Sequence, residues 1–557
     1  MTPPLQTILL PFTPRFILLT AAVIATAYFS WLNLTELQFN VWSSLLLIVS
    51  SSFTALGIRD LVQTKHSILR NYPIAAHLRF ILENIRPEMR QYFFEADKEG
   101  APFPRDKRAI VYQRAKRELD KRPFGTQHDV YDSKFEWLQH SLAPHEPPDQ
   151  PFRISIGSET CLQPYSASIF NISAMSYGAL SANAIRALNR GAKLGEFAHD
   201  TGEGGVSCYH KEFGGDLIWE IGSGYFGCRK TNGKFCRDQF AATAADPQIK
   251  MIELKLSQGA KPGHGGVLPG AKVTAEIARI RSVPQGRDCI SPARHSAFST
   301  PLELILFLSE LRRLSGGKPV GIKLCVGHPW ELMAIIKAMR EVGDTPDFIV
   351  VDGKEGGTGA APLEFMDHVG MPLRDGLNMV HSALTGAELR HRIKIGASGK
   401  IVSAFDMVRT MALGADWCNS ARGFMFAVGC IQAQACHTDR CPTGVTTQDP
   451  TRSRAVVVAT KSDRVASFHA QTVKALAELI AAAGLDHPSK LQPHHIMHRI
   501  SSDRAVSFAD LYPVAKPGAL LSGMADPRLQ AAWNIATPLS FAPASMPEIT
   551  PVTLAVG

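Results

Sequence analysis

Short apolar runs alternate with helical stretches through the middle of the chain. The runs that predict β-strands are residues 169–175, 197–200, 251–256, 289–291, 320–326, 348–352, 393–397 and 417–420. Amphipathic segments such as 302–314 and 330–342 lie between them. Because strands that alternate with helices pair in parallel, eight such units predict an α/β fold with a (β/α)8 TIM barrel over residues 151–450. A doubly wound open sheet is the competing fold, but no G-x-G-x-x-G sequence follows the first strand.

Two apolar runs, residues 16–34 and 41–58, stand near the N-terminus. The first contains no charge and is long enough to cross a hydrocarbon core of ~30 Å as a helix. A cleaved signal peptide is an alternative for this run, but it lacks a clear A-x-A site and a second run follows at once. A buried core hairpin is the other alternative. We therefore predict that residues 1–59 form two transmembrane helices.

Basic residues flank this predicted hairpin on the outside, at Arg15 and then at Arg59, Lys65 and Arg70. The positive-inside rule then places both ends of the hairpin in the cytoplasm. This predicts an inner-membrane protein whose catalytic domain lies on the cytoplasmic side.

The regions on either side of the barrel carry no catalytic pattern. Residues 60–150 are polar, basic and helical in periodicity, which predicts a helical docking region between membrane and enzyme, with a linker at 145–151. Residues 451–557 predict a helix at 465–483 and an extended, proline-rich tail.

Composition narrows the function classes. The 557 residues are 45% hydrophobic and 20% charged, which describes a folded chain. The formal charge of +9 is spread out, with no basic run interleaved with aromatic residues, so nucleic acid is not an expected partner. The ten cysteines show no disulfide framework and fit a reducing compartment.

Three cysteines lie within twelve residues in the segment 429–448, called the cysteine loop below. They are Cys430, Cys436 and Cys441, and a proline follows the third. Thiolates are the ligands of iron–sulfur clusters, and three local thiolates suit a three-iron cluster, with Cys418 as an unneeded fourth candidate. A zinc site and chance clustering of buried cysteines remain as alternatives, although zinc usually takes four ligands.

Glycine-rich segments follow the predicted strands, where a barrel carries its functional loops. They are SAMSYGALS (173–181), TGEGG (201–205), LSQGAKPGHGGVLPG (256–270), VDGKEGGTGAAP (351–362), ASGK (397–400) and NSARG (419–423), with ISPARH (290–295) at the fourth predicted strand. Each alone marks only a tight turn. Taken in order with the cysteine loop, they resemble the flavin domain of glutamate synthase, where C-x5-C-x4-C-P-x-G-V-x-S/T-Q holds a [3Fe-4S] cluster. The resemblance covers roughly residues 150–450.

The resemblance implies FMN at the mouth of the barrel, with Cys430, Cys436 and Cys441 as cluster ligands. Lys323, on an otherwise apolar strand, is expected to face the flavin N1–C2 edge, where a cation stabilises the reduced ring. The other residues expected to contact FMN, with the phosphate at the last five, are Ala174, Met175, Ser176, Gln258, Gly356, Gly357, Thr358, Ser398, Gly399, Ala421, Arg422 and Gly423.

The reaction implied is reductive amination of a 2-oxo acid, 2-oxoglutarate to glutamate, with electrons that pass from the cluster to FMN. Lys261 lies where the family binds the substrate carboxylate, and Arg281 aligns with a family arginine. Glu203 matches the family glutamate on the ammonia side. With Lys323, Lys261 and Glu203 form the predicted catalytic set. The expected electron donor is ferredoxin or a reductase subunit, since no dinucleotide-binding fingerprint is present.

Three departures change the predicted substrate pocket. Tyr225 replaces the arginine of the family sequence S-G-R-F-G and is retained as a substrate-binding candidate. Val267 replaces a substrate-side glutamine, and His264 falls at an acidic position. A lost charge-assisted contact costs about 1.5–3 kcal/mol.

The chain also lacks the family's amidotransferase and β-helix domains, so free ammonia or an amine from a partner is expected. Two other hypotheses therefore stay open. One keeps the cofactors but acts on an N-alkyl amino acid or another amine. The other is a non-enzymatic electron-transfer or scaffold subunit. The sequence permits an oligomer but does not define one.

Overall fold

A computed structural model describes residues 9–35, 40–121 and 123–544. The chain divides into two compact units, Met1–Arg105 and Asp106–Gly557, which are described separately. The last part of the predicted C-terminal tail, 545–557, lies outside the described residues.

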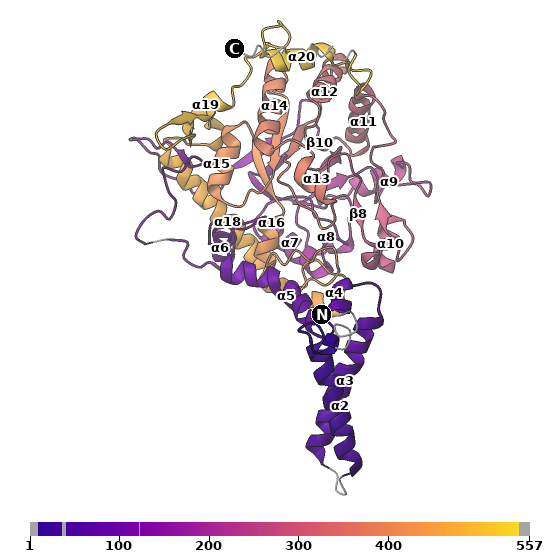
Figure 1. Cartoon of the computed structure of the whole chain (residues 1–557). Coiled ribbons are helices and arrows are strands. Elements are labelled where there is room, and N and C mark those ends of the chain that lie inside the picture. Colours follow the sequence, from indigo (N-terminus) through magenta and orange to yellow (C-terminus); the bar gives the residue numbers. More distant parts are fainter. Residues whose placement is uncertain (1–8, 36–39, 122, 545–557) are drawn as a thin grey trace, which may run out of the picture. The chain divides into compact units, whose positions relative to one another are not determined.

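The first unit contains two long apolar helices, α2 (Ile17–Thr35) and α3 (Val41–Val62), packed side by side as a hairpin (Figure 1). The Thr26 and Thr54 hydroxyls lie 2.9 Å apart between the helices. Both helices are long and apolar enough to cross a membrane, a criterion that a core helix or a signal sequence also meets. The shorter elements of this unit are η1 (Leu10–Phe12), α4 (Ser67–Asn71), α5 (Ala75–Met89) and η2 (Arg90–Phe94).

The second unit is built on a closed barrel of eight parallel strands, which confirms the predicted TIM-barrel fold. The strands, in chain order, are β4 (Phe170–Ile172), β5 (His199–Asp200), β6 (Leu217–Ile221), β7 (Ile249–Lys255), β10 (Val320–Leu324), β11 (Phe348–Asp352), β12 (Lys394–Ser398) and β13 (Trp417–Ser420). The first and last of these pair through Phe170 and Cys418, which closes the cylinder.

One of the eight predicted strands is wrong, and one barrel strand was missed. Residues 289–291 do not enter the barrel; β9 (Cys289–Ile290) pairs antiparallel with β8 (Val267–Leu268) in an insertion after β7. The missing barrel strand is β6, which was not predicted because Glu220 interrupts its apolar run. Glu220 is tolerated inside the barrel because Lys323 pairs with it across the interior.

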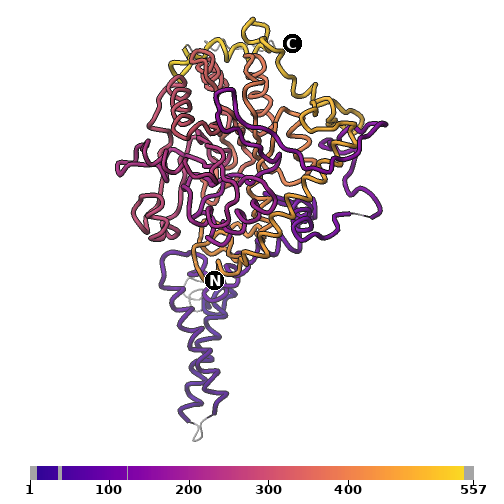
Figure 2. The backbone as a smooth tube through the Cα atoms, turned by 180° about the vertical axis from the view of Figure 1, so that it is seen from behind, coloured from indigo at the N-terminus to yellow at the C-terminus, as the bar shows by residue number. Residues whose placement is uncertain are grey.

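Helices surround the barrel as the alternating pattern requires (Figures 1 and 2). The predicted helices at 302–314 and 330–342 are confirmed as α11 (Pro301–Leu314) and α12 (Pro329–Val342), and the C-terminal helix as α18 (Val458–Ala482). The remaining outer helices are α7 (Ala182–Leu194), α8 (Cys208–Lys211), α9 (Arg237–Ala244), α10 (Ala275–Arg281), α13 (Leu363–His368), α14 (Leu373–Gly386), α15 (Ala404–Ala412) and α16 (Arg422–Val428).

Smaller elements decorate this unit. A three-stranded antiparallel sheet joins β1 (Glu136–Leu138), β14 (Ile496–Arg499) and β15 (Ala505–Ser507). A hairpin of β2 (Arg153–Ile156) and β3 (Tyr165–Ser168) leads into the first barrel strand. Four further helices are α6 (Arg105–Lys116), α17 (Pro450–Ser453), α19 (Phe508–Leu511) and α20 (Pro527–Ile535).

Candidate active site

Charged side chains occupy two successive layers inside the barrel. The register of β6 and β7 places Glu220 beside Glu253, and the register of β7 and β10 places Lys255 beside Lys323. Because every second residue of a strand faces the same side, the carboxylates form one layer and the lysines form the next layer toward the C-terminal strand ends. Together with Asp200 at the end of β5, these five residues are called the carboxylate–lysine core.

Lys323 connects the two layers. Its ammonium lies 2.6 Å from Glu220 Oε2 and 3.6 Å from Glu253 Oε1, and all three side chains are buried. Burial alone would lower the pKa of Lys323, but the attraction of Glu220, Glu253 and Asp200 raises it well above the ordinary value. Lys323 therefore stays positively charged, as its predicted role beside a reduced flavin requires.

Two carboxylates of the core face each other without enough positive charge to ionise both. Burial and then the neighbouring Glu220 raise the pKa of Asp200 to about 7. Burial and then Asp200 raise the pKa of Glu253 well above its usual range. Like charges held close together in a dry interior cannot both be stable, so one proton is retained between them.

Glu203 lies above the core in the loop after β5. Lys255 Nζ is 2.9 Å from Glu203 Oε1. Burial would raise the pKa of Glu203, but Lys255, Arg281 and Lys261 together bring it below its ordinary value. Two glycines make room for the carboxylate: a Cβ at Gly266 would lie 2.0 Å from Oε1, and one at Gly222 would lie 2.5 Å from Oε2. The two glycines therefore leave space for the Glu203 carboxylate at the mouth, and the neighbouring cations keep it ionised.

Two predicted substrate cations lie near Glu203. Lys261 is buried, and its ammonium donates to the Ala360 carbonyl at 3.0 Å. Burial lowers the pKa of Lys261 to about 8, although Glu203 partly opposes this shift. Arg281 is also buried and donates to the Tyr177 carbonyl at 3.1 Å and the Ser176 hydroxyl at 3.3 Å.

The predicted flavin-facing loops meet around the same mouth. The Met175 amide donates to the Asp200 carbonyl at 3.4 Å, and Lys255 Nζ donates to Gln258 Oε1 at 3.2 Å. A Cβ at Gly202 would lie 2.8 Å from the Ser176 amide nitrogen, so the loops after β4 and β5 touch through their backbones. Ala174 lies in the first of these loops. The structure thus brings the predicted face residues to one end of the barrel.

The predicted phosphate end has a donor set that fits an anion. Arg422 begins α16, and Lys400 follows β12 after Gly399. Burial lowers the pKa of Lys400, and repulsion from Arg422 adds to this lowering. Burial lowers the pKa of Arg422 to about 10. A phosphate would offset both effects.

The remaining residues predicted for this end lie close by. Gly357 approaches Arg422, with a Cβ placed 2.8 Å from Nη1, and the Ser398 hydroxyl lies 3.2 Å from that of Ser173. Gly356 and Thr358 flank Gly357, Gly399 follows Ser398, and Ala421 and Gly423 flank Arg422.

The cysteine loop is attached to the mouth by several contacts. Buried Lys272 donates to the Thr446 carbonyl at 2.7 Å and the Ala179 carbonyl at 3.0 Å. Gln448 Nε2 donates to the carbonyls of Gly178 and Leu180 at 3.0 and 2.9 Å. The loop is therefore bound to the segment that follows β4.

The three thiols of this loop are close enough to influence one another. Burial raises the pKa of Cys430 to about 12, and the charges of Cys436 and Cys441 add to this shift. Hydrogen bonds from Thr443 and Thr446 outweigh burial and lower the pKa of Cys441 to about 7. Within the described residues, these three sulfurs are not among the groups whose ligand atoms all lie within 4.8 Å of one another.

The cysteine loop also approaches the loop that carries the partner of Lys261. A Cβ at Gly359 would lie 3.6 Å from Cys436 Cβ, and the next residue, Ala360, accepts the Lys261 hydrogen bond. Cys436 therefore lies against Gly359, and the neighbouring residue Ala360 accepts the hydrogen bond from the predicted catalytic Lys261.

Tyr225 has a different role from the one its position suggested. Its side chain is fully buried, and its hydroxyl accepts from the amides of Ser296 and Ala297 at 3.2 and 3.1 Å. His295 Nε2 lies 2.8 Å from the Lys255 carbonyl and must donate to it, so Nδ1, 3.1 Å away, accepts from the Tyr225 hydroxyl. Every hydrogen-bonding position of the phenol is therefore used within the protein.

Replacing Tyr225 with phenylalanine is expected to lower the free energy of unfolding by about 1–3 kcal/mol, because two backbone amides lose their acceptor and buried His295 loses its donor. The Michaelis constant for the substrate should stay within about twofold of the wild-type value. Urea unfolding and steady-state kinetics measure the two effects, with exposed Tyr131 changed to phenylalanine as the control. A raised Michaelis constant with unchanged stability would instead show that Tyr225 contacts substrate.

The other two departures lie in the insertion after β7. Val267 begins β8, and His264 Nδ1 is 2.9 Å from the Gly265 carbonyl with its ring against Phe365. Neither contact involves the carboxylate–lysine core.

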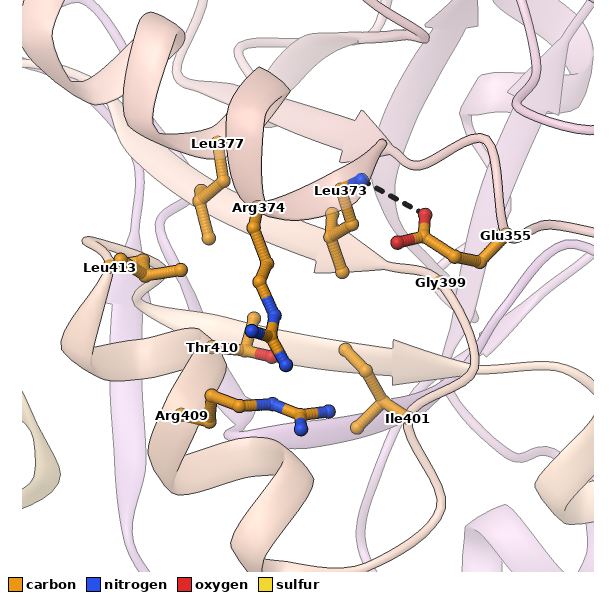
Figure 3. A pocket seen from close by; sticks show the side chains of 9 residues that line it. All are labelled: Glu355, Leu373, Arg374, Leu377, Gly399, Ile401, Arg409, Thr410 and Leu413. Atoms are coloured by element: carbon orange, nitrogen blue, oxygen red, sulfur yellow. Dashed lines mark hydrogen bonds between the residues drawn. The ribbon is translucent and has the colours of Figure 1, made fainter. Parts of the chain in front are cut away.

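Two hollows are lined by residues other than the carboxylate–lysine core. One of about 30 Å³ is lined by Glu355, Gly399, Arg374 and Arg409, and Figure 3 shows Glu355 turned to accept from the Leu373 amide at 2.9 Å. It is too small for a flavin or an organic acid. The other, of about 740 Å³, lies where β6 and β7 begin, the end of a barrel associated with stability rather than catalysis.

Sequence reasoning missed four residues of the site: Asp200, Glu220, Glu253 and Lys255. The available signal was a charged residue within a buried strand, the same signal that identified Lys323. Lys255 and Glu253 lie inside the predicted strand 251–256. Buried charges of this kind are rare without a functional or pairing reason.

The barrel and its charged mouth define a (β/α)8-barrel enzyme whose reacting end is built from buried ion pairs. The model described as the conserved region in glutamate synthase matches residues 139–486. The chain belongs to the glutamate synthase family and is an oxidoreductase of that type.

Individual relatives support this assignment. The chain is 38% identical over 500 residues to the glutamate synthase large subunit-like protein YerD of Bacillus subtilis, a match that covers 82% of this chain and 95% of that protein. It is 35% identical over 317 residues to the archaeal-type glutamate synthase (NADPH) of Thermotoga neapolitana, covering 56% of this chain and 59% of that protein. A solved flavocytochrome b2 with benzoylformate aligns over 75% of this chain and 83% of its own at 11% identity, with a TM-score of 0.40, a likeness too low to support any argument.

Proposed function

We propose that this protein binds FMN and a [3Fe-4S] cluster and reductively aminates a 2-oxo acid, with 2-oxoglutarate as the first candidate. The observation that carries the proposal is the cation pair Lys261 and Arg281 beside ionised Glu203 at the barrel mouth. Cations suit the carboxylates of an oxo acid, and a carboxylate suits an incoming ammonium ion.

Each side chain has one task in this proposal. Lys261 and Arg281 would bind and orient the acid, Glu203 would hold ammonium and accept a proton from its nitrogen, and Lys323 would keep a positive charge beneath the flavin ring. Arg422, Lys400 and the Ser398–Gly399 backbone would hold the phosphate, with Ala174, Met175, Ser176 and Gln258 around the ring. When bound, FMN supplies hydride transfer and the cluster on Cys430, Cys436 and Cys441 supplies single-electron transfer.

Hairpin α2–α3 would anchor the protein in the inner membrane, with the barrel on the cytoplasmic side. The region between hairpin and barrel would then dock the enzyme near the membrane. Ferredoxin or a reductase subunit would deliver electrons.

The test is an assay of the full chain with chemically reduced ferredoxin, ammonium and a series of 2-oxo acids. Glutamate formation from 2-oxoglutarate supports the proposal. No product from any oxo acid contradicts it.

The Michaelis constant for the 2-oxo acid is expected to rise about tenfold per pH unit above pH 8, because deprotonation removes the Lys261 charge there. Below pH 8 the Lys261 side chain is charged, so the Michaelis constant for the 2-oxo acid should not change with pH. Replacing Lys261 with glutamine should raise the constant about 10–100-fold at pH 7 and abolish the rise. Arg279→Gln, on the same helix as Arg281, is the control and should change neither quantity. A pH-independent constant in the wild type would contradict the assigned role.

A second candidate substrate is an amine or an N-alkyl amino acid, oxidised at the same site. The observation that favours it is that all hydrogen bonds of the Tyr225 hydroxyl are made to protein groups. Tyr225 therefore has no hydrogen bond left for the second carboxylate of 2-oxoglutarate. Bleaching of the oxidised flavin by an amine, with none by glutamate, would favour this candidate.

A further inference from the structure

The carboxylate–lysine core forms an unbroken series of ionisable groups from the barrel interior to its mouth. Asp200, Glu220 and Glu253 each place an oxygen within 4.8 Å of the others. Lys323 lies 3.6 Å from Glu253 and 2.6 Å from Glu220. Lys255 then lies 3.9 Å from Glu220 and 2.9 Å from Glu203.

The inner end of this series is unsatisfied in hydrogen bonding. Within the described part of the chain, both Glu253 oxygens and Asp200 Oδ2 are buried and have no hydrogen-bond partner. Buried carboxylate oxygens are costly in that condition. A proton shared between the two side chains satisfies both at once, whereas a metal ion would have to displace the Lys323 ammonium from Glu220.

We propose that Asp200 and Glu253 are a proton store, connected through Lys323, Glu220 and Lys255 to Glu203 at the mouth. This inference rests on the proposed function, because a 2-oxo acid, an ammonium ion, two electrons and two protons combine to give one amino acid and one water molecule. The store supplies one of those two protons through Glu203, solvent supplies the other, and the store is refilled from solvent with the next electron pair.

The transfer leaves the charges of Lys323, Glu220 and Lys255 unchanged. Glu253 gives a proton to Lys323 as Lys323 gives one to Glu220, and Glu220 gives one to Lys255 as Lys255 gives one to Glu203. One proton thus leaves the Asp200–Glu253 pair and one arrives at Glu203. The charged groups that act on the pair are Glu220 from β6 and Lys323 from β10, and Asp352 acts on Lys323 from β11.

Infrared spectroscopy of the full chain tests the store without any assay of activity. A protonated carboxylic acid has a carbonyl stretch apart from the amide and carboxylate bands, and it shifts in heavy water. We expect this band in the wild type at pH 6, a decrease of the band as Asp200 ionises through about pH 7, and its absence in Glu253→Gln. Asp216→Asn, at the opposite end of β6, is the matched control and should keep the band.

The midpoint potential of the bound flavin gives a second readout. If the store takes up one proton with each electron pair, the midpoint potential falls by an extra ~30 mV per pH unit, because a tenfold change in proton concentration shifts a two-electron couple by that amount. Glu253→Gln should remove this part of the pH dependence of the potential. A wild type without the band, or a band that persists in both Asp200→Asn and Glu253→Gln, would overturn the store. If a variant fails to fold, the wild-type pH titration decides alone. A chain that holds no flavin but shows the band would overturn the proposed function and leave the store intact.

Discussion

Replacing Lys323 with methionine is expected to lower the free energy of unfolding by about 3–5 kcal/mol and to abolish turnover. The reason is that Glu220 and Glu253 would remain buried without the ammonium that lies 2.6 and 3.6 Å from them. Urea unfolding of the full chain, followed by the fluorescence of buried Trp219 and Trp417, measures the change.

A second substitution separates lost pairing from lost volume. The double variant Lys323→Met with Glu220→Gln removes both charges and should recover at least half of the lost stability. The control is Lys250→Met at the start of β7, where the ammonium is 3.8 Å from Asp216 and more than a third exposed, so the change should stay below about 1 kcal/mol. A Lys323 variant as stable as this control would show that the core is not held by charge.

Replacing Cys436 with serine is expected to remove most of the iron and inorganic sulfide from the protein and to lower turnover at least tenfold. A hydroxyl is a poor ligand for a cluster, and Cys436 is the thiol whose backbone approaches Gly359 in the loop of the predicted substrate lysine. Metal analysis and electron paramagnetic resonance measure the loss.

Cys208→Ser is the matched control, because this thiol is exposed and lies on α8, away from the cysteine loop. It should retain iron, sulfide and turnover at wild-type levels. Equal iron content in the two variants would remove Cys436 from the ligand set.

The barrel could be predicted because its strands are mostly apolar runs that alternate with amphipathic helices. Seven strands were located from this pattern, while β6 was missed because Glu220 lies within it. The short run at 289–291 has strand composition but pairs inside an insertion. Composition shows only that a run prefers an extended, buried place, and the partner strand is decided by tertiary packing.

The site was predictable only in part, for a related reason. Loops at the C-terminal strand ends converge in any barrel, so the order of their motifs was enough to place Lys261, Glu203 and Arg281 together. The pairing of Lys323 with Glu220 joins residues 103 positions apart and depends on strand register, which no local pattern contains. Tyr225 was interpreted from its position alone, and its internal hydrogen bonds could be found only in three dimensions.

The central claim is that the barrel mouth holds a flavin next to an iron–sulfur centre on Cys430, Cys436 and Cys441. The most direct test is to purify the full chain anaerobically and measure its content of flavin, iron and sulfide. The number of reactive thiols is then counted before and after mild removal of the metal. The account predicts FMN, a cluster, and three thiols that are protected until the metal is removed. A colourless protein with no iron, whose three thiols react at once, would contradict it.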